Sequence, residues 1–485
     1  MSVGSVGGGR LAGLWRLLGS SLVARVGMAA VNFGQFWLLS HHYPAERLGG
    51  FSLLMNLYLM LQLLPLLGLS LPLARRVATD EAGRAAEVAN ALALALPVAG
   101  LIAAGLVAAG HLAYPPWLAL PFTLVALAML PTAWTLVAES VLLGLERAGD
   151  IARVQFGEAL LRTAGTAAVV ALDGGLAAVF AVFLVLRVLS AWRYARHPAV
   201  PRPRRALLSM ALQRRNAAEI PVYLGIAVLA ALASRLDIVA LSRLGDLHEV
   251  GRYAAAARLY DAALMLPTLA ALILMPTLAR RFQSDPQSFG PMLVRAVGAV
   301  LALGSLLALA VAGLAAPIVR LLYPPELHGA APVLRWLIFA AVWLTVDQLL
   351  SSTMIAAQAP RQDLASMAVA LALLAAGLLL LVPLQGPVGA AQAVLLAMLG
   401  RVAWRVRWAA QRFAVPALWG VLARVALAAG AAVAALVLAE QRLGEPAALA
   451  AALTVYALAA LASGLAGPRP WQQAAAAWRA RRGAA

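Results

Sequence analysis

The sequence predicts an all-α polytopic membrane protein with about 14 transmembrane helices. Composition, the spacing of apolar segments and an internal repeat predict this class. Of the 485 residues, 63% are hydrophobic and 12% are charged, whereas a soluble domain is about half apolar and roughly a quarter charged. The charged residues are too few to cover the surface of a large soluble enzyme, so that class is excluded.

Apolar segments of spanning length recur along the whole chain, separated by charged residues or by Pro and Gly. Each is long enough to cross a bilayer, which takes about 20 residues. The first two predicted spans lie near residues 17–39 and 48–72. The eleventh and twelfth lie near 364–383 and 387–404, and the last lies near 446–466.

The basic residues predict the orientation of these spans. All 38 are arginine, and the net charge is +18. If the N-terminus is cytoplasmic, 24 arginines fall in the tails and the even-numbered loops, and five fall in the outer loops. Basic residues gather in cytoplasmic loops, so we expect both termini in the cytoplasm. The positive charge then reports topology, and we expect no nucleic-acid partner.

Missing residue types exclude several chemistries. The sequence has no lysine and no cysteine, so a Walker-A phosphate loop, Schiff-base chemistry, disulfides and thiolate metal ligands are excluded. The six histidines lack zinc-like spacing, since His41 and His42 are simply adjacent. We expect neither a metal nor a cofactor, no catalytic residue, and a protein that is not an enzyme.

An internal repeat relates residues 39–65 to residues 241–267 at a constant offset of 202. Both copies then reach a proline and Ala-Arg-Arg. Matching positions include Gly49/Gly251, Phe51/Tyr253, Tyr58/Tyr260 and Pro65/Pro267. Six predicted spans separate the copies, so both copies enter the membrane in one orientation. The repeat therefore predicts two six-helix bundles around a midplane site, plus two extra C-terminal helices, as in a transporter that works by alternating access.

The repeat also predicts the domain organisation. Two basic segments, the loop between the lobes and the C-terminal tail, have amphipathic patterns that favour binding to anionic headgroups of the lipid bilayer. The predicted parts are an N-lobe at 1–192 (helices 1–6), a cytoplasmic basic interlobe loop at 193–216, a C-lobe at 217–410 (helices 7–12), helices 13–14 at 411–468, and a basic cytoplasmic tail at 469–485.

Several short motifs resemble a known family. They are AERLGGFS at 45–52, HEVGRYAA at 248–255, LERAGDIARV at 145–154, SRLDIVALSRLG at 234–245 and LYPPELHGAAPVLR at 322–335. In combination they look like the polysaccharide-transporter family (O-antigen or lipid-linked oligosaccharide flippases) of the multidrug/oligosaccharidyl-lipid/polysaccharide exporter superfamily. The resemblance spans about residues 15–410.

The resemblance implies a secondary transporter for cell-surface polysaccharide biosynthesis. Such a flippase moves an undecaprenyl-pyrophosphate-linked oligosaccharide from the inner to the outer leaflet of the bacterial inner membrane. We expect a monomer that contacts polysaccharide polymerase or export machinery. The alternatives are a peptidoglycan lipid II flippase, a multidrug or cation antiporter of the same fold, and a membrane glycosyltransferase or polymerase, which the short outer loops disfavour.

Charged residues inside predicted spans are the candidate site. At mid-helix such a residue costs about 2.5–3.5 kcal/mol and normally faces a cavity or a partner. Arg25 and Arg235 have no acidic residue three or four positions away, and a guanidinium matches phosphate oxygens bidentately. We expect both to bind the pyrophosphate; the alternative is salt bridges to Asp237, Asp261 or Asp347. An anionic substrate disfavours the cation antiporter.

Two further arginines have an acidic residue on the same helix. Glu158 and Arg162 are four positions apart, and Arg258 and Asp261 are three apart. Each pair can form an ion pair within its own helix. Alternatively, Arg162 and Arg258 are additional ligands of the pyrophosphate. Arginines near span ends are expected to extend to the membrane surface; these are Arg187, Arg295, Arg335, Arg401 and Arg424.

The remaining polar residues are assigned to the substrate path and to coupling. Asn32, Gln35, Asn56 and Gln62 either line the path of the sugars or form interhelical hydrogen bonds. Candidates for coupling to protons or Na⁺ are Asp237, Asp261, Asp347 and Glu158. For Asp347 we favour an arginine partner on another helix. Prolines repeated in both lobes are expected to kink helices 2 and 8; these are Pro65, Pro72, Pro267 and Pro276.

Overall fold

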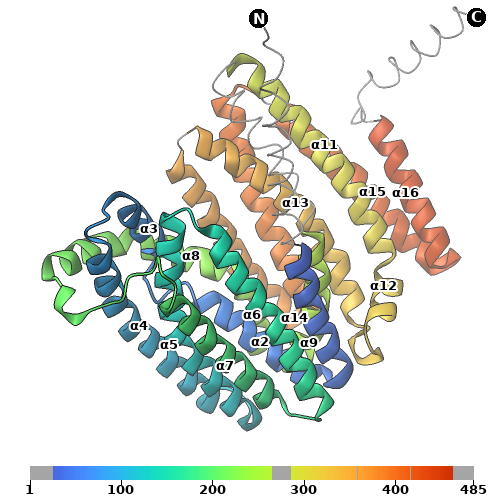
Figure 1. The fold of residues 1–485 in the computed structure, drawn as a ribbon. Helices are drawn as coiled ribbons and strands as arrows, with labels where there is room; N and C mark the ends of the chain where they lie inside the picture. The colour runs from blue at the N-terminus through green and yellow to red at the C-terminus, as the bar shows by residue number, and fades with distance from the viewer. Residues whose placement is uncertain (1–25, 265–285, 358, 416, 463–485) are drawn as a thin grey trace, which may run out of the picture. The chain divides into compact units, whose positions relative to one another are not determined.

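The computed structural model describes residues 26–264, 286–357, 359–415 and 417–462, and these residues form helices and no strand (Figure 1). This confirms the all-α prediction. After an N-terminal helix described from residue 26 to 42, the helices are α2 Ala45–Leu61, α3 Ser70–Thr79, α4 Arg84–Leu112, α5 Pro116–Gly144, α6 Ala148–Ala171, α7 Leu176–Ala195, η1 Arg205–Leu207, α8 Met210–Leu244, α9 Leu247–Ala263, α11 Pro286–Gly313, α12 Ala315–Leu322, η2 Pro325–Leu327, α13 Ala330–Ala356, α14 Pro360–Arg412, α15 Ala417–Leu443 and α16 Glu445–Ala462.

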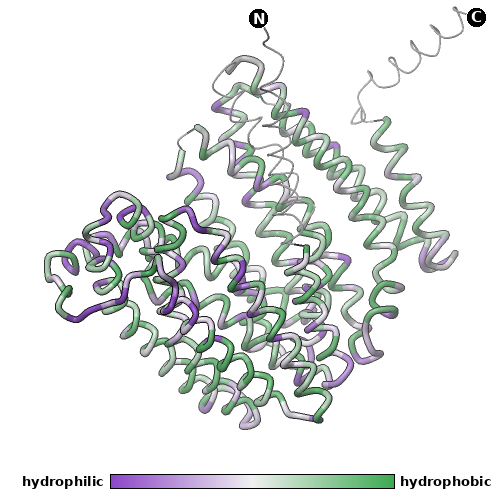
Figure 2. Tube along the Cα trace, in the orientation of Figure 1, coloured by the Kyte–Doolittle hydropathy of each residue, from purple (hydrophilic) through white to green (hydrophobic). Residues whose placement is uncertain are grey.

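The long helices identify a multi-pass membrane protein. Among the described residues, eight helices are long and apolar enough to cross a membrane: α4, α5, α7, α8, α11, α13, α14 and α15. Figure 2 shows hydrophobic residues along these helices and hydrophilic ones around η1 and the start of α8. Helix α14 is two helices joined at Gly386, whose φ of 54° and ψ of −128° are not helical. This break lies between the predicted spans 364–383 and 387–404.

The chain divides into two compact units. Unit 1 comprises residues 1–242 and 246–251, and unit 2 comprises residues 243–245 and 252–485. Contacts place most of α8 in unit 1, where the Tyr114 hydroxyl lies 3.1 Å from that of Ser242. The predicted lobe boundary at residue 217 rests on the repeat and stays a prediction.

Two repeated glycines make a reciprocal helix crossing within unit 1. A Cβ on Gly49 of α2 would lie 1.7 Å from the carbonyl oxygen of Leu247, and one on Gly251 of α9 would lie 2.1 Å from that of Ala45. Adding 202 to Gly49 and Ala45 gives Gly251 and Leu247, so the repeat relates the two contacts. Only glycine permits this approach, because any Cβ would overlap the facing backbone.

The predicted span 48–72 is interrupted and not kinked, which corrects the expectation for helix 2. Helix α2 ends at Leu61 and α3 begins at Ser70, with Pro65 in the turns between them. Leu67 and Gly68 have φ values of 51° and 81°, which continuous helix does not allow. Pro72 falls in the first turn of α3, where its missing N–H leaves no helical hydrogen bond unmade. Pro267 and Pro276 lie outside the described residues.

The core of each unit is apolar. In unit 1, Tyr58 packs edge-on against Phe183 with ring centroids 4.8 Å apart. At the turn after the N-terminal helix, the buried Tyr43 hydroxyl donates to the Gly174 carbonyl oxygen. Burial raises the pKa of Tyr43, so this hydroxyl stays a hydrogen-bond donor. In unit 2, α11, α13, α14 and α15 share one apolar core.

Candidate functional site

A polar cluster joins the N-terminal helix to α6 and brings together three residues that the sequence assigns to the site. Arg162 Nε donates to Gln35 Oε1 at 3.1 Å, and Arg162 Nη2 donates to Asn32 Oδ1 at 2.6 Å. Gln35 Nε2 donates in turn to the hydroxyl of Thr166 at 2.9 Å. The hydrogen bonds that were one option for Asn32 and Gln35 are therefore present. They fix the orientation of the Arg162 guanidinium.

Glu158 belongs to a second network, on the side of α6 that faces α7. Its carboxylate lies 2.9 Å from Arg187 Nη1, and the Ser190 hydroxyl donates to it at 2.6 Å. Arg187 Nη2 donates to the Thr135 hydroxyl at 2.8 Å. Within the described residues no ion pair joins Glu158 to Arg162, so the expected pairing on one helix is wrong. The ion-pair partner of Glu158 is instead Arg187 of α7.

Arg187 does not extend to the membrane surface, which corrects a second expectation. Its side chain is 12% exposed, and its guanidinium carbon lies 5.8 Å from the ring centre of Tyr58. Spacing along one helix does not reveal this network, because its members lie on α5, α6 and α7. The available signal was the presence of Thr135 and Ser190 among apolar neighbours on α5 and α7.

Arg235 lies on α8, nine residues before the end of that helix at Leu244. At 1.5 Å per residue this places it about 14 Å from the helix end, well inside a span. The side chain is half-buried, and no hydrogen bond or ion pair links it to any residue that the structure describes. Asp237, two residues further on, is also half-buried. Arg25 lies outside the described residues.

Asp347 is the centre of a charge network in unit 2. Its carboxylate lies 2.8 Å from Arg405 Nη1 and 3.3 Å from Arg401 Nε. Arg405 is fully buried and also pairs with Asp363. The favoured interhelical arginine partner of Asp347 is therefore confirmed. Arg401 was expected to reach the surface; that expectation is wrong, because Asp347 of α13 neutralises it inside the helix pair.

The other intramembrane charges also have partners. Arg258 and Asp261 pair along α9 at 3.6 Å, as predicted. Arg335, which was expected to extend to the membrane surface, forms an ion pair with Glu440 of α15 at 2.6 Å. Arg295 and Arg424 are exposed, as expected, and each also donates to a carbonyl of its own helix.

The last two predicted path residues both lie on or next to α2. Asn56 is buried and donates to the Ser52 carbonyl oxygen at 2.7 Å, while its Oδ1 has no partner among the described residues. Gln62 follows the end of α2 and is half-buried. The described part of the chain holds no group of three or more His, Asp or Glu residues arranged for a metal ion.

Comparison with known proteins identifies the class of fold. No protein-family model matches the sequence, and no curated protein matches it. The fold is similar to that of solved structures of the flippase MurJ and of MATE family transporters.

Particular solved structures show how far the likeness extends. The chain is similar to the inward closed conformation of the lipid II flippase MurJ, with a TM-score of 0.71 and 13% identity over 91% of this chain and 97% of that one. It is similar to an inward-facing multidrug resistance MATE family transporter, with a TM-score of 0.65 and 14% identity over 80% of this chain and 95% of that one. It is also similar to a MOP superfamily transporter from Pyrococcus furiosus, with a TM-score of 0.55 and 14% identity over 82% of this chain and 95% of that one.

Proposed function

We propose that this protein is a flippase that moves an undecaprenyl-pyrophosphate-linked oligosaccharide from the inner to the outer leaflet by alternating access. The observation that carries the proposal is Arg235, a half-buried cation inside α8 without a partner among the described residues. Such residues in membrane proteins mark substrate pathways. A guanidinium binds two phosphate oxygens at once, and a low-dielectric site strengthens that attraction.

The fold supports transport of a molecule with an anionic head and a hydrocarbon tail. Within unit 2, α11 and α13 line an apolar pocket of about 310 Å³, with Leu303, Leu307 and Ile338 among its walls. An apolar pocket suits a polyprenyl chain, and the guanidinium of Arg235 suits a pyrophosphate. The MOP-superfamily fold supplies a scaffold of known transporters.

In this proposal Arg235 acts with Arg25 and with Arg162 and Arg258 as ligands of the pyrophosphate. Asn32 and Gln35 orient Arg162 through the hydrogen bonds described above. The amides of Asn56 and Gln62 contact the sugars. The Oδ1 of Asn56 is a buried acceptor that a sugar hydroxyl would satisfy.

Coupling to a proton or Na⁺ gradient is assigned to the carboxylates. Glu158 and Asp347 are each held in short ion pairs, so binding a cation there requires an arginine to move away. Asp261 is more available, because its contact with Arg258 is 3.6 Å long and 36% of its side chain is exposed. Asp237 is two positions from Arg235 in the sequence. We therefore place coupling at Asp261 or Asp237 first.

A lipid II flippase is the second candidate, and the likeness to MurJ across 91% of this chain favours it. Its substrate presents the same pyrophosphate, so the proposed role of Arg235 is the same for both candidate functions. A multidrug or cation antiporter would place this cation against a substrate of like charge. A membrane glycosyltransferase or polymerase is the least favoured. The proposal also includes a monomer in the bacterial inner membrane with both termini cytoplasmic, next to polymerase or export machinery.

Liposome transport tests the proposal. The purified protein is reconstituted, and a labelled pyrophosphate-linked oligosaccharide and labelled lipid II are followed between leaflets in parallel, with and without an ion gradient. We expect Arg235→Ala to lower the transport rate at least about tenfold, which equals the loss of about 1.4 kcal/mol of stabilisation. Arg295→Ala, which removes an exposed arginine, is the matched control and should transport at the wild-type rate.

Two results would contradict the proposal. One is wild-type transport by a correctly inserted Arg235→Ala variant. The other is the absence of protein-dependent movement of either lipid. Faster transport of lipid II than of the oligosaccharide would select the second candidate.

A further inference from the structure

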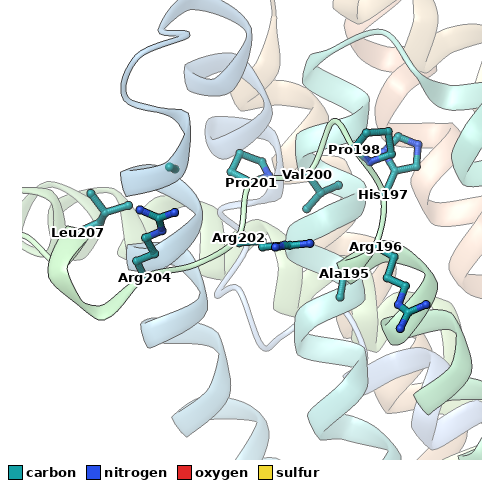
Figure 3. Close-up of a pocket in the computed structure, with 10 residues that line it drawn as sticks. Ala195, Arg196, His197, Pro198, Val200, Pro201, Arg202, Arg204 and Leu207 are labelled. Carbon is teal, nitrogen blue, oxygen red and sulfur yellow. The ribbon is translucent and has the colours of Figure 1, made fainter.

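A basic pocket opens in unit 1 where α7 ends and the chain runs toward η1. Its volume is about 490 Å³. Figure 3 shows Arg202 and Arg204 projecting from the extended segment, with Val200 and Pro201 beside them and Arg196 below. Among the residues that line it, three are arginines, one is His197 and none is acidic. The transport site proposed above uses none of these residues.

The pocket is built from a rigid, anchored segment. Val200 is buried against Ala138, Leu142 and Tyr194, which fixes the start of the segment. Pro201 and Pro203 then restrict the backbone next to each arginine. Arg204 has extended dihedrals, with φ −124° and ψ 133°. Arg202 and Arg204 both line the pocket, and the neighbouring prolines reduce the backbone entropy that is lost when the segment binds an anion.

The positive charge of the pocket is not cancelled locally. The carboxylate that approaches it is Asp150, which lies 3.3 Å from His197 Nε2. Asp150 already forms ion pairs with Arg147 at 3.3 Å and with Arg153 at 3.1 Å. Arg196 stacks over the Trp192 ring at 4.2 Å, a contact that leaves its N–H groups able to donate to an anion. Arg202 and Arg204 are exposed.

The neighbouring residues place the pocket at the level of lipid headgroups. Helix α7 is one of the apolar spans, and the pocket begins at its last residue, Ala195. Trp192, one turn earlier, is 49% exposed, as tryptophans at a membrane surface are. Leu208 and Met210, on the other side of η1, are 50% and 70% exposed. Apolar surface thus lies beside the guanidiniums, where acyl chains would extend from a bound headgroup.

We propose that this pocket binds the phosphate headgroup of an anionic phospholipid from the leaflet on the predicted cytoplasmic side. Arg202 and Arg204 would hold the phosphate oxygens, and Arg196 would complete the site. Basic pockets beside transmembrane helices bind anionic headgroups in this way. The inference does not depend on the identity of the transported substrate.

Native mass spectrometry of the full chain in detergent tests the pocket. Phosphatidylglycerol is the anionic probe, phosphatidylcholine the zwitterionic control, and inorganic pyrophosphate the soluble phosphate. We expect preferential retention of phosphatidylglycerol by the wild-type protein. Each arginine near the surface contributes about five- to sixfold, so Arg202→Ala with Arg204→Ala should weaken retention about 30-fold. Both side chains are exposed, so the variant should keep its fold, which circular dichroism checks.

The matched control removes the same charge elsewhere. Arg407→Ala with Arg412→Ala takes away two exposed arginines at the end of α14 and should change retention less than twofold. Equal losses in the two double variants would show bulk charge attraction and overturn the proposal. Undiminished retention by the Arg202/Arg204 variant would also overturn it. Binding of pyrophosphate without binding of phosphatidylglycerol would assign the pocket to a soluble phosphate instead.

Discussion

The two units bury charge in different ways. Unit 1 pairs one carboxylate, Glu158, with one guanidinium, Arg187, and completes the network with the hydroxyls of Thr135 and Ser190. Unit 2 brings two carboxylates and two guanidiniums together around the fully buried Arg405. Both networks are neutral overall, which is the condition for burying charge without a large desolvation penalty.

The difference lies in what remains when one member is lost. In unit 1, the Thr135 hydroxyl and the Tyr58 ring still contact Arg187 after its carboxylate partner is removed. In unit 2, the loss of Asp347 leaves Arg405 with the carboxylate of Asp363, 24% of whose side chain is exposed, and leaves Arg401 without an ion-pair partner among the described residues. The unit 2 network should therefore depend more strongly on each member. By contrast, Arg235 belongs to neither network.

The largest effect should come from Asp347→Ala. It leaves buried positive charge uncompensated, so we expect the free energy of unfolding to fall by about 3–5 kcal/mol. Denaturant unfolding of the protein in detergent micelles, followed by tryptophan fluorescence, measures the change. An unfolding midpoint equal to that of the wild type would contradict the expected dependence of the unit 2 network on Asp347.

A smaller effect is expected for Glu158→Ala, about 1.5–3 kcal/mol, the typical worth of a hydrogen bond to a charged group. The same unfolding measurement applies. A double-mutant cycle with Glu158→Gln and Arg187→Met should show a coupling of about 0.5–3 kcal/mol. If Glu158→Ala destabilises the protein more than Asp347→Ala does, the ordering of the two networks is reversed.

The smallest effect is expected for Arg335→Ala. Its ion pair with Glu440 is short, but the two side chains are 28% and 29% exposed. Partly exposed pairs contribute little, so the free energy of unfolding should change by less than about 1 kcal/mol. A loss as large as that of Asp347→Ala would mean that exposure does not separate the strong pairs from the weak ones.

Residue spacing predicted some of the site and failed for the rest. The contact between Arg258 and Asp261 was predictable, because residues three apart on a helix are neighbours. The same rule assigned Glu158 to Arg162, and the structure pairs Glu158 with Arg187, 29 residues away. Spacing describes one helix at a time, whereas Glu158 and Asp347 are neutralised by guanidiniums on other helices. The interhelical partner of Asp347 was expected, but its identity was not.

The sequence by itself determined the class of the fold. Hydropathy is a local property of each segment, and backbone groups inside a bilayer must pair within their own segment, so long apolar runs lead directly to membrane-spanning helices. The repeat was likewise readable, and the contacts of Gly49 and Gly251 follow its offset of 202.

Only the tertiary structure decided which charges neutralise one another, where α2 ends, and that Arg202 and Arg204 line a pocket. These features depend on distances between side chains far apart in sequence. Helix packing sets such distances, and the composition of any one helix does not contain them.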